Sequence, residues 1–335
     1  MQILDNSLRD QIGETFVSQK QFSEQLRKSE YKERLQILKR FEEVFRASFD
    51  EMYEAAAKDF CRPKTEVDMT EIMVVLSELA IVRKNLKKWM KPKKVLPTLL
   101  LFGTSSQIIK EPKGVTLIIS PWNYAFNLTF NPMISAIAAG NTVIIKPSEH
   151  SPNMSRVIEK IVSDSFESKH VSIFQGDSSV AEHLTNMPFD HIFFTGSPEI
   201  GKHVMSAAAK NLSSVTLELG GKSPVVIHES ADLEKAADAI VFSKFLNNGQ
   251  TCIAPDYLLV QNSVSDEFLK QIKRSIIKQF GEDDQMINND DYGRLVTNAH
   301  YGRVNSLLNE SIKDGADVII GGVTDEADKY ISPTV

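Results

Sequence analysis

Short apolar runs alternate with helix-like stretches from Gly114 onward, and this alternation constrains the fold more than any other feature of the chain. The runs typical of strands are 115–119, 142–145, 171–174, 191–194, 215–217 and 224–227. Helix-like stretches lie between them at 131–139, 154–166, 180–185 and 200–211. Strands buried on both faces are apolar throughout, and strands that alternate with helices pair in parallel. We therefore predict an α/β fold with a parallel sheet covered on both faces.

The flanking segments have different patterns. Residues 5–90 repeat apolar positions at helical spacing, which predicts helices packed on the later sheet. Segments 96–102 and 106–109 are expected to pair as a hairpin around Gly103-Thr104. Beyond Cys252 a second α/β unit is expected, with strands at 257–260 and 317–320 and helices at 266–280 and 300–314.

Composition excludes several classes of protein. The 335 residues carry a net charge of −6, so no basic surface for nucleic acid is expected. The apolar runs are far shorter than the roughly 18 residues that span a bilayer, and the N-terminus lacks the pattern of a secretion signal. With only two cysteines, neither a disulfide framework nor a cysteine-rich metal site is expected. We predict a cytoplasmic protein without a metal centre.

Two residues suggest chemistry. Cys252 follows a turn-like Asn-Asn-Gly-Gln-Thr segment, a setting in which a thiol can act as a nucleophile. Glu218 precedes Gly220 and Gly221, and its carboxylate is a candidate general base. A nucleophile and a base in distinctive contexts favour an enzyme.

Two segments suggest a bound nucleotide. Thr195-Gly196-Ser197 leads through Pro198 to Gly201, a strand, a turn and a helix start that could hold a pyrophosphate. Its Gly-x4-Gly spacing fits no standard phosphate motif, and an ordinary strand-to-helix turn explains it equally well.

The second segment follows the apolar run at 142–145. Lys146 and Glu149 could hydrogen-bond ribose hydroxyls there or lie in solvent. After the first run, the side chain of Asn123 could donate to an oxyanion or belong to a plain turn.

Taken together and in order, five motifs resemble the aldehyde dehydrogenase superfamily. They are Pro121-Trp122-Asn123, Gly140-Asn141-Thr142 through Lys146-Pro147-Ser148-Glu149, Phe194-Thr195-Gly196-Ser197 through Gly201, Leu217-Glu218-Leu219-Gly220-Gly221-Lys222-Ser223-Pro224 and Gly249-Gln250-Thr251-Cys252. The phrase Cys252-Ile253-Ala254-Pro255-Asp256-Tyr257 resembles the class 3 and fatty-aldehyde branch. The resemblance extends from the N-terminal helices to the end of the chain.

The resemblance implies NAD(P)-dependent oxidation of aldehydes to carboxylic acids. Cys252 would form a thiohemiacetal and then a thioester, Asn123 would hold the oxyanion, and Glu218 would activate the hydrolytic water. The implied cofactor contacts are Trp122, Lys146, Glu149, Thr195, Gly196, Ser197, Gly201 and Leu219. We expect NAD with NADP as the alternative, because Glu149 would repel a 2′-phosphate.

The family also implies an architecture. Residues 1–95 and 113–218 would form a Rossmann-type cofactor domain, 96–112 the β-hairpin of an oligomerisation arm, and 219–335 an incomplete α/β catalytic domain.

The family chain continues further, with a Glu-Glu-x-Phe-Gly-Pro motif, so we expect this chain alone to be impaired in activity or assembly. A homodimer and a medium- or long-chain aliphatic or aromatic aldehyde are expected. The alternatives are a coenzyme A-acylating enzyme, a cysteine hydrolase and a non-catalytic cofactor-binding or scaffold protein of the same fold.

Overall fold

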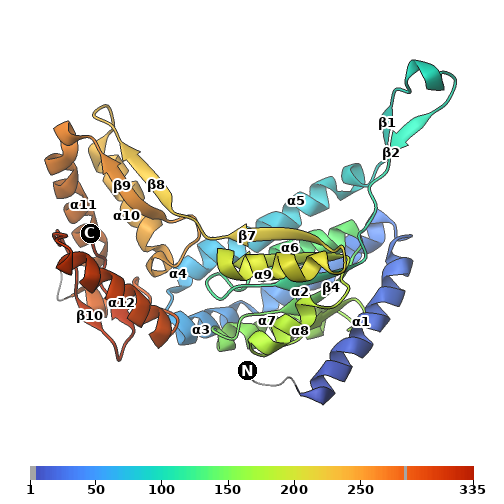
Figure 1. The fold of residues 1–335 in the computed structure, drawn as a ribbon, viewed down its shortest axis with the longest axis horizontal. Helices are drawn as coiled ribbons and strands as arrows, with labels where there is room; N and C mark the ends of the chain where they lie inside the picture. The colour runs from blue at the N-terminus through green and yellow to red at the C-terminus, as the bar shows by residue number, and fades with distance from the viewer. Residues whose placement is uncertain (1–4, 283–284) are drawn as a thin grey trace. The chain divides into compact units, whose positions relative to one another are not determined.

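A computed structural model describes residues 5–282 and 285–335 of the chain, coloured along the sequence in Figure 1. The chain divides into two compact units. Unit 1 contains the residues up to Asp50, then Thr70–Glu149 and Ser155–Glu218; unit 2 contains Glu51–Met69, His150–Met154 and Leu219–Val335.

The predicted N-terminal helical region is confirmed. Its helices are α1 (Asn6–Leu26), α2 (Tyr31–Ala47), α3 (Phe49–Phe60), α4 (Lys64–Val67), the π-helical turn η1 (Asp68–Ile72) and α5 (Met73–Trp89). A capping box joins Glu30 to Glu33 at the start of α2. Pro63 separates α3 from α4, since proline cannot continue a helix from the preceding turn.

Unit 1 is built on the predicted sheet. Its strands are β3 (Val115–Ile119), β4 (Thr142–Lys146), β5 (Val171–Ile173), β6 (His191–Gly196) and β7 (Ser214–Leu219), in the order β5-β4-β3-β6-β7. The pairs β3–β4, β3–β6 and β4–β5 are parallel, as predicted. The chain winds outward from β3 in both directions, so the strand order reverses between β3 and β6. In such sheets, ligands bind beyond the carboxyl ends of the strands at this point.

Helices cover both faces of the sheet. They are α6 (Asn127–Ala139), α7 (Pro152–Ser165), α8 (Ser178–Thr185) and α9 (Pro198–Ala209), and each begins before its predicted start. The first turns of α8 and α9 carry polar residues without apolar periodicity, and their N-caps are the side chains of Asp177 and Ser197. One sheet face packs on a core with Ile12, and Phe41 contacts Phe130 and Phe166 in a separate aromatic cluster.

The hairpin forms with a different first strand. β1 (Lys93–Val95) pairs antiparallel with β2 (Ser106–Ile108), so the strand predicted at 96–102 is wrong. Pro97 has no N–H to donate to a ladder, and a 3-10 turn, η2 (Leu99–Leu101), closes the loop with Phe102 N–H donating to the Leu99 carbonyl. The hairpin is the thin arm beside α5 in Figure 1.

Unit 2 contains a second, parallel pair of strands, β8 (Ser223–Ile227) and β9 (Pro255–Val260). The run 224–227 therefore belongs to this sheet. The helical elements are α10 (Leu233–Phe245), η3 (Leu246–Gly249), η4 (Asn262–Val264), α11 (Ser265–Phe280), η5 (Met286–Asn288) and α12 (Asn298–Lys313). They enclose an apolar core that includes Phe268 and Tyr330.

The strand predicted at 317–320 is wrong. Ile319 and Ile320 exchange only two backbone hydrogen bonds with Val335, too few for a ladder. The antiparallel pair in this region is instead β10 (Thr324–Asp325) with β11 (Tyr330–Ile331).

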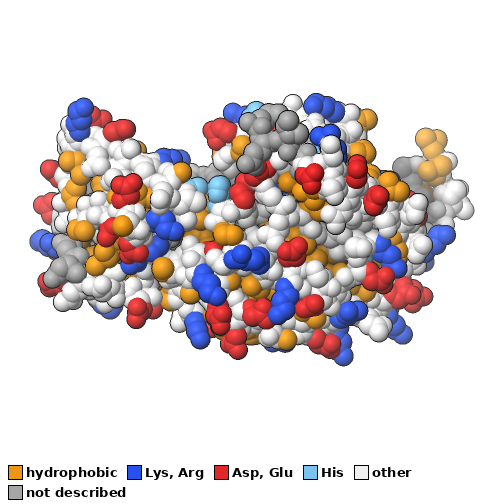
Figure 2. Space-filling model, turned by 90° about the horizontal axis from the view of Figure 1, so that it is seen from below, with side chains coloured by type: hydrophobic (Ala, Val, Ile, Leu, Met, Phe, Trp, Pro, Cys, Tyr) orange, Lys and Arg blue, Asp and Glu red, His pale blue; other side chains and the backbone are white. Residues whose placement is uncertain are grey.

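Surface character agrees with the composition. Acidic and basic side chains are intermixed on the face shown in Figure 2. Within residues 5–282 and 285–335, no helix combines the length and the apolarity needed to cross a membrane.

Candidate active site

The carboxyl end of β4 carries a paired lysine and glutamate. Lys146 is buried, with 3% of its side chain exposed, and its Nζ lies 2.5 Å from Oε2 of Glu149. The Glu149 side chain is 37% exposed, so a ligand can reach it from solvent. Both residues were predicted from the sequence to follow this strand, and the structure brings them into contact. A lysine donor and a carboxylate acceptor together could bind the hydroxyls of a ribose.

The carboxyl end of β6 has an unsatisfied polar atom. Thr195 Oγ1 is buried and has no hydrogen-bond partner in the described part of the chain. A Cβ on Gly196 would lie 2.5 Å from the Phe194 ring, so only glycine fits there without a shift. The Ser197 hydroxyl accepts from Ile200 N–H at 3.3 Å and caps α9, in which Gly201 is buried. A buried unpaired hydroxyl is unfavourable. These residues therefore fit a polar ligand such as the pyrophosphate of a dinucleotide.

Four more predicted residues lie at the same edge of the unit 1 sheet. Trp122 and Asn123 are half-buried in the turn after β3, and Glu218 and Leu219 are exposed at the end of β7. Because β3, β6 and β7 are neighbours in the sheet, their carboxyl ends are adjacent. This edge of the sheet therefore carries the Asn123 amide and the Glu218 carboxylate on either side of the strand end that contains Thr195.

Cys252 belongs to unit 2, where its side chain is exposed in the turn between η3 and β9. Asn247 and Asn248, shortly before it, both have left-handed backbones, with φ of 51° and 55°. For residues other than glycine this conformation costs on the order of 1–2 kcal/mol, less for asparagine. The chain that presents the thiol is therefore strained and needs support.

Side chains from distant parts of unit 2 supply that support. Arg62 donates to Asn247 Oδ1 from Nε at 3.1 Å and from Nη2 at 2.6 Å. Asn247 N–H donates to Glu66 Oε2 at 3.1 Å, and Gln250 Nε2 donates to the Asn247 carbonyl at 3.0 Å. Burial raises the pKa of Glu66 to about 7, against the opposing effects of Arg62 and the Asn247 N–H.

No local pattern in the sequence points to Arg62 and Glu66, which lie 185 and 181 residues from Asn247 along the chain. The second cysteine, Cys61, is also exposed and has a left-handed backbone. Lys222, part of the Gly220-Gly221 motif, is exposed and pairs with Asp256 at 3.0 Å.

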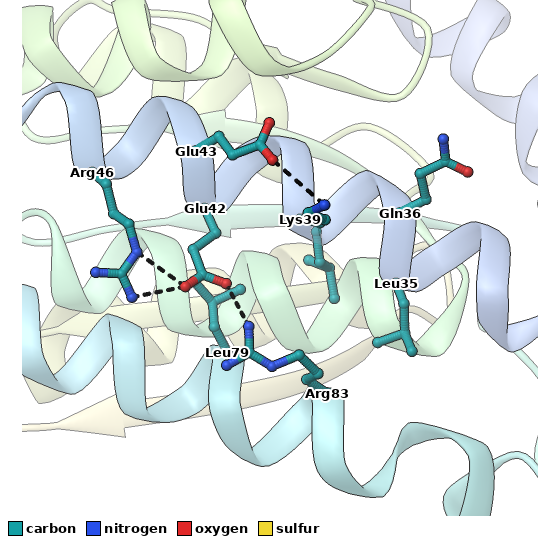
Figure 3. Close-up of a pocket in the computed structure, with 9 residues that line it drawn as sticks. Leu35, Gln36, Lys39, Glu42, Glu43, Arg46, Leu79 and Arg83 are labelled. Atoms are coloured by element: carbon teal, nitrogen blue, oxygen red, sulfur yellow. Dashed lines mark hydrogen bonds and ion pairs between the residues drawn. The ribbon is translucent and has the colours of Figure 1, made fainter.

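A surface groove of about 480 Å³ lies between α2 and α5 in unit 1 (Figure 3). Glu42 accepts from Arg46 and from Arg83 at its rim, while Leu35 and Leu79 form part of the wall. The groove contains none of the predicted site residues. The Glu42 carboxylate is already paired with the guanidinium groups of Arg46 and Arg83, so we assign the groove no part in the chemistry.

The family model for "Aldehyde dehydrogenase family" matches residues 7–335. This chain belongs to the aldehyde dehydrogenase family. The chain is 42% identical to the 4,4'-diaponeurosporen-aldehyde dehydrogenase of Staphylococcus aureus, over 97% of this chain and 70% of that protein. It is 39% identical to aldehyde dehydrogenase family 3 member A2 of Pongo abelii, over 90% of this chain and 61% of that protein.

Solved structures agree with the fold. The substrate-bound Staphylococcus aureus AldH has a TM-score of 0.92 and 41% identity, over 96% of this chain and 69% of that one. An NADP-dependent enzyme of E. coli has a TM-score of 0.88 and 26% identity, over 97% of this chain and 68% of that one. The Mycobacterium tuberculosis aldehyde dehydrogenase complexed with NAD+ has a TM-score of 0.82 and 25% identity, over 92% of this chain and 64% of that one.

These findings confirm the predicted family, its class 3-like branch and its α/β fold. The protein is an NAD(P)-dependent oxidoreductase of the aldehyde dehydrogenase family.

Proposed function

We propose that Cys252, Asn123 and Glu218 carry out the oxidation of an aldehyde to a carboxylic acid. The observation that carries this assignment is the exposed thiol of Cys252, presented by a turn that side-chain hydrogen bonds hold in a strained conformation. Unit 1 supplies the other groups at one edge of its sheet. We further propose that residues 1–95 and 113–218 form the cofactor domain, 96–112 belong to the oligomerisation arm, and 219–335 form the catalytic domain.

The chemistry follows from these groups. The Cys252 thiolate forms an S–C bond to the aldehyde carbon, and the oxyanion accepts hydrogen bonds from the Asn123 amide and the Cys252 N–H. The bound nicotinamide supplies the hydride acceptor for this family of reactions. Loss of the C–H bond with its electron pair leaves a thioester on Cys252. Glu218 then accepts a proton from water as the water oxygen bonds to the acyl carbon, and the S–C bond breaks to regenerate the thiolate.

Cofactor binding is assigned to unit 1. Lys146 and Glu149 would bind the adenosine ribose, and Thr195, Gly196 and Ser197 would line the path of the pyrophosphate. The remaining proposed contacts are Trp122, Gly201 and Leu219. The unpaired Thr195 hydroxyl and the lack of room for a Cβ at Gly196 support this assignment. The partly open Glu149 carboxylate favours NAD over NADP, because a 2′-phosphate would meet a like charge.

The protein is proposed to act in the cytoplasm. Its substrate is proposed to be a medium- or long-chain aliphatic or aromatic aldehyde. The similarity to the 4,4'-diaponeurosporen-aldehyde dehydrogenase and to family 3 member A2 supports the proposed substrate class. Glu218, a base suited to activating water, favours hydrolysis over transfer of the acyl group to coenzyme A.

A homodimer is also proposed, with the hairpin as the pairing arm. Its tip exposes Leu99, Leu100 and Phe102 to 95%, 97% and 91%. Apolar side chains gather at this end of the molecule at the right of Figure 2. Exposed apolar side chains of this kind support a role for the tip in subunit pairing.

The test compares the two exposed cysteines. NAD reduction is followed by absorbance on mixing the protein with a panel of aldehydes, for the wild type, Cys252→Ala and Cys61→Ala. We expect aldehyde-dependent reduction by the wild type and Cys61→Ala, and at least a thousandfold loss in Cys252→Ala, on the order reported for loss of a nucleophile. Equal rates in both variants would refute the assignment of Cys252.

A further inference from the structure

We propose that Arg62 and Glu66 are positioning residues for Cys252. This pair, the Arg62–Glu66 clamp, holds Asn247 in its left-handed conformation and so fixes the turn that presents the Cys252 thiol and N–H. The inference rests on the proposed role of Cys252. It adds two residues of the N-terminal region that act through Asn247.

The contacts of the clamp define one backbone position. Asn247 is buried, with 3% exposure, and both its side chain and its N–H are engaged, the first by Arg62 and the second by Glu66. Arg62 is itself 3% exposed, and its guanidinium lies 4.8 Å from the centre of the Phe60 ring. A planar guanidinium that approaches one oxygen from two nitrogens fixes direction as well as distance. The clamp therefore acts on the orientation of the strained residue.

The rest of the turn is tied to the clamped residue. Gln250 bridges three backbone groups: its Nε2 donates to the carbonyls of Asn247 and Arg294, and its Oε1 accepts from Val296 N–H. Asn248 Nδ2 donates to the Gly293 carbonyl at 2.8 Å. These bonds extend as far as Gln250, two residues before Cys252. Movement at Asn247 is thus transmitted to the thiol through a short, hydrogen-bonded segment.

The clamp contains a group that titrates near neutrality. The pKa of Glu66 is about 7, mainly through burial, and the charged groups that face it are Arg62 and Asp291, with the phenol of Tyr292 nearby. Ionised Glu66 accepts the Asn247 N–H and is stabilised by the positive charge of Arg62, whereas the protonated acid is a weaker acceptor. The clamp should therefore tighten as the pH rises through about 7.

The first test needs no aldehyde or NAD. In a Cys61→Ala background, alkylation of Cys252 by iodoacetamide is measured from pH 5.5 to 9 by peptide mass spectrometry. Because the thiol itself ionises over this range, the readout is the ratio of the wild-type rate to the Glu66→Gln rate, which cancels thiolate formation. We expect this ratio to change near the Glu66 pKa of about 7. The substitution keeps the shape and an acceptor oxygen, so the variant should fold. A ratio that stays constant with pH would overturn the proposal.

The second test separates positioning from folding. Arg62→Gln should lower kcat by about 10- to 100-fold with the aldehyde KM changed by less than about twofold, because a shift of about 1 Å in a reacting group has an effect of this order. Arg62→Lys should recover part of the loss.

Arg34→Gln is the matched control for the second test. Arg34 is a buried arginine of unit 1 that donates to the Ala138 carbonyl. This variant should melt at a lower temperature while kcat per folded molecule stays unchanged. Equal kcat losses in Arg62→Gln and Arg34→Gln would contradict the clamp. Altered alkylation profiles in a protein without dehydrogenase activity would instead refute the proposed function and leave the clamp standing.

Discussion

At the scale of single residues, the choice between NAD and NADP depends on one carboxylate. Lys146 is buried at the end of β4 and holds Glu149 where an adenosine ribose would lie in the proposed complex. The Glu149 side chain is 37% exposed, so its negative charge is accessible to a ligand. Glu149 would therefore repel a phosphate on the 2′ oxygen.

Glu149→Gln tests this assignment. The amide can still hydrogen-bond a ribose hydroxyl, but it does not repel a phosphate. We expect the ratio of kcat/KM for NADP to that for NAD to rise at least about fivefold, since like charges about 4 Å apart repel by about 1 kcal/mol even in water. Glu182→Gln, at an exposed carboxylate of α8, should leave the ratio unchanged. An unchanged ratio in Glu149→Gln would show that Glu149 does not face the ribose.

Residues that local sequence places at strand ends could be predicted, and residues that act through long-range contacts could not. Lys146 and Thr195 directly follow apolar runs, and Asn123 lies in the turn after another, so the parallel sheet fixes their edge. Arg62 and Glu66 have no such signal. They meet Asn247 only because unit 2 brings together two segments that are far apart in the sequence.

At the scale of elements, continuous apolar runs predict strands correctly where neighbouring strands supply the partners for their backbone hydrogen bonds. This holds for β3 and β4, whose residues are all buried. It fails at 96–102, where the apolar residues form the exposed tip of a hairpin and the strand is the lysine-containing Lys93–Val95. The apolar side chains of this tip are exposed instead of buried, as expected if another protein chain covers them.

A triple substitution tests the hairpin tip. Leu99→Ser, Leu100→Ser and Phe102→Ser together should weaken the proposed homodimer at least about 100-fold in sedimentation velocity, because each large apolar side chain contributes about 1.5 kcal/mol or more when buried. The melting temperature of the monomer should change little, since these side chains are exposed. Leu307→Ser, at an exposed leucine of α12, is the control. Unchanged sedimentation of the triple variant would argue against a pairing role for the tip.

At the scale of the whole molecule, the proposed reaction requires both units. Cys252 and the clamp belong to unit 2, whereas Asn123, Glu218 and the cofactor contacts belong to unit 1. The central claim is that the acyl group passes through Cys252 and leaves by hydrolysis that Glu218 promotes.

Trapping the acyl group tests this claim most directly. The Glu218→Gln variant is mixed with NAD and an aldehyde, quenched in acid and mapped by peptide mass spectrometry. We predict about one equivalent of NADH without further turnover, and an acyl group on the peptide that contains Cys252, while the Cys61 peptide stays unmodified. An acyl group on Cys61, or NADH formed without any acylated cysteine, would contradict the account.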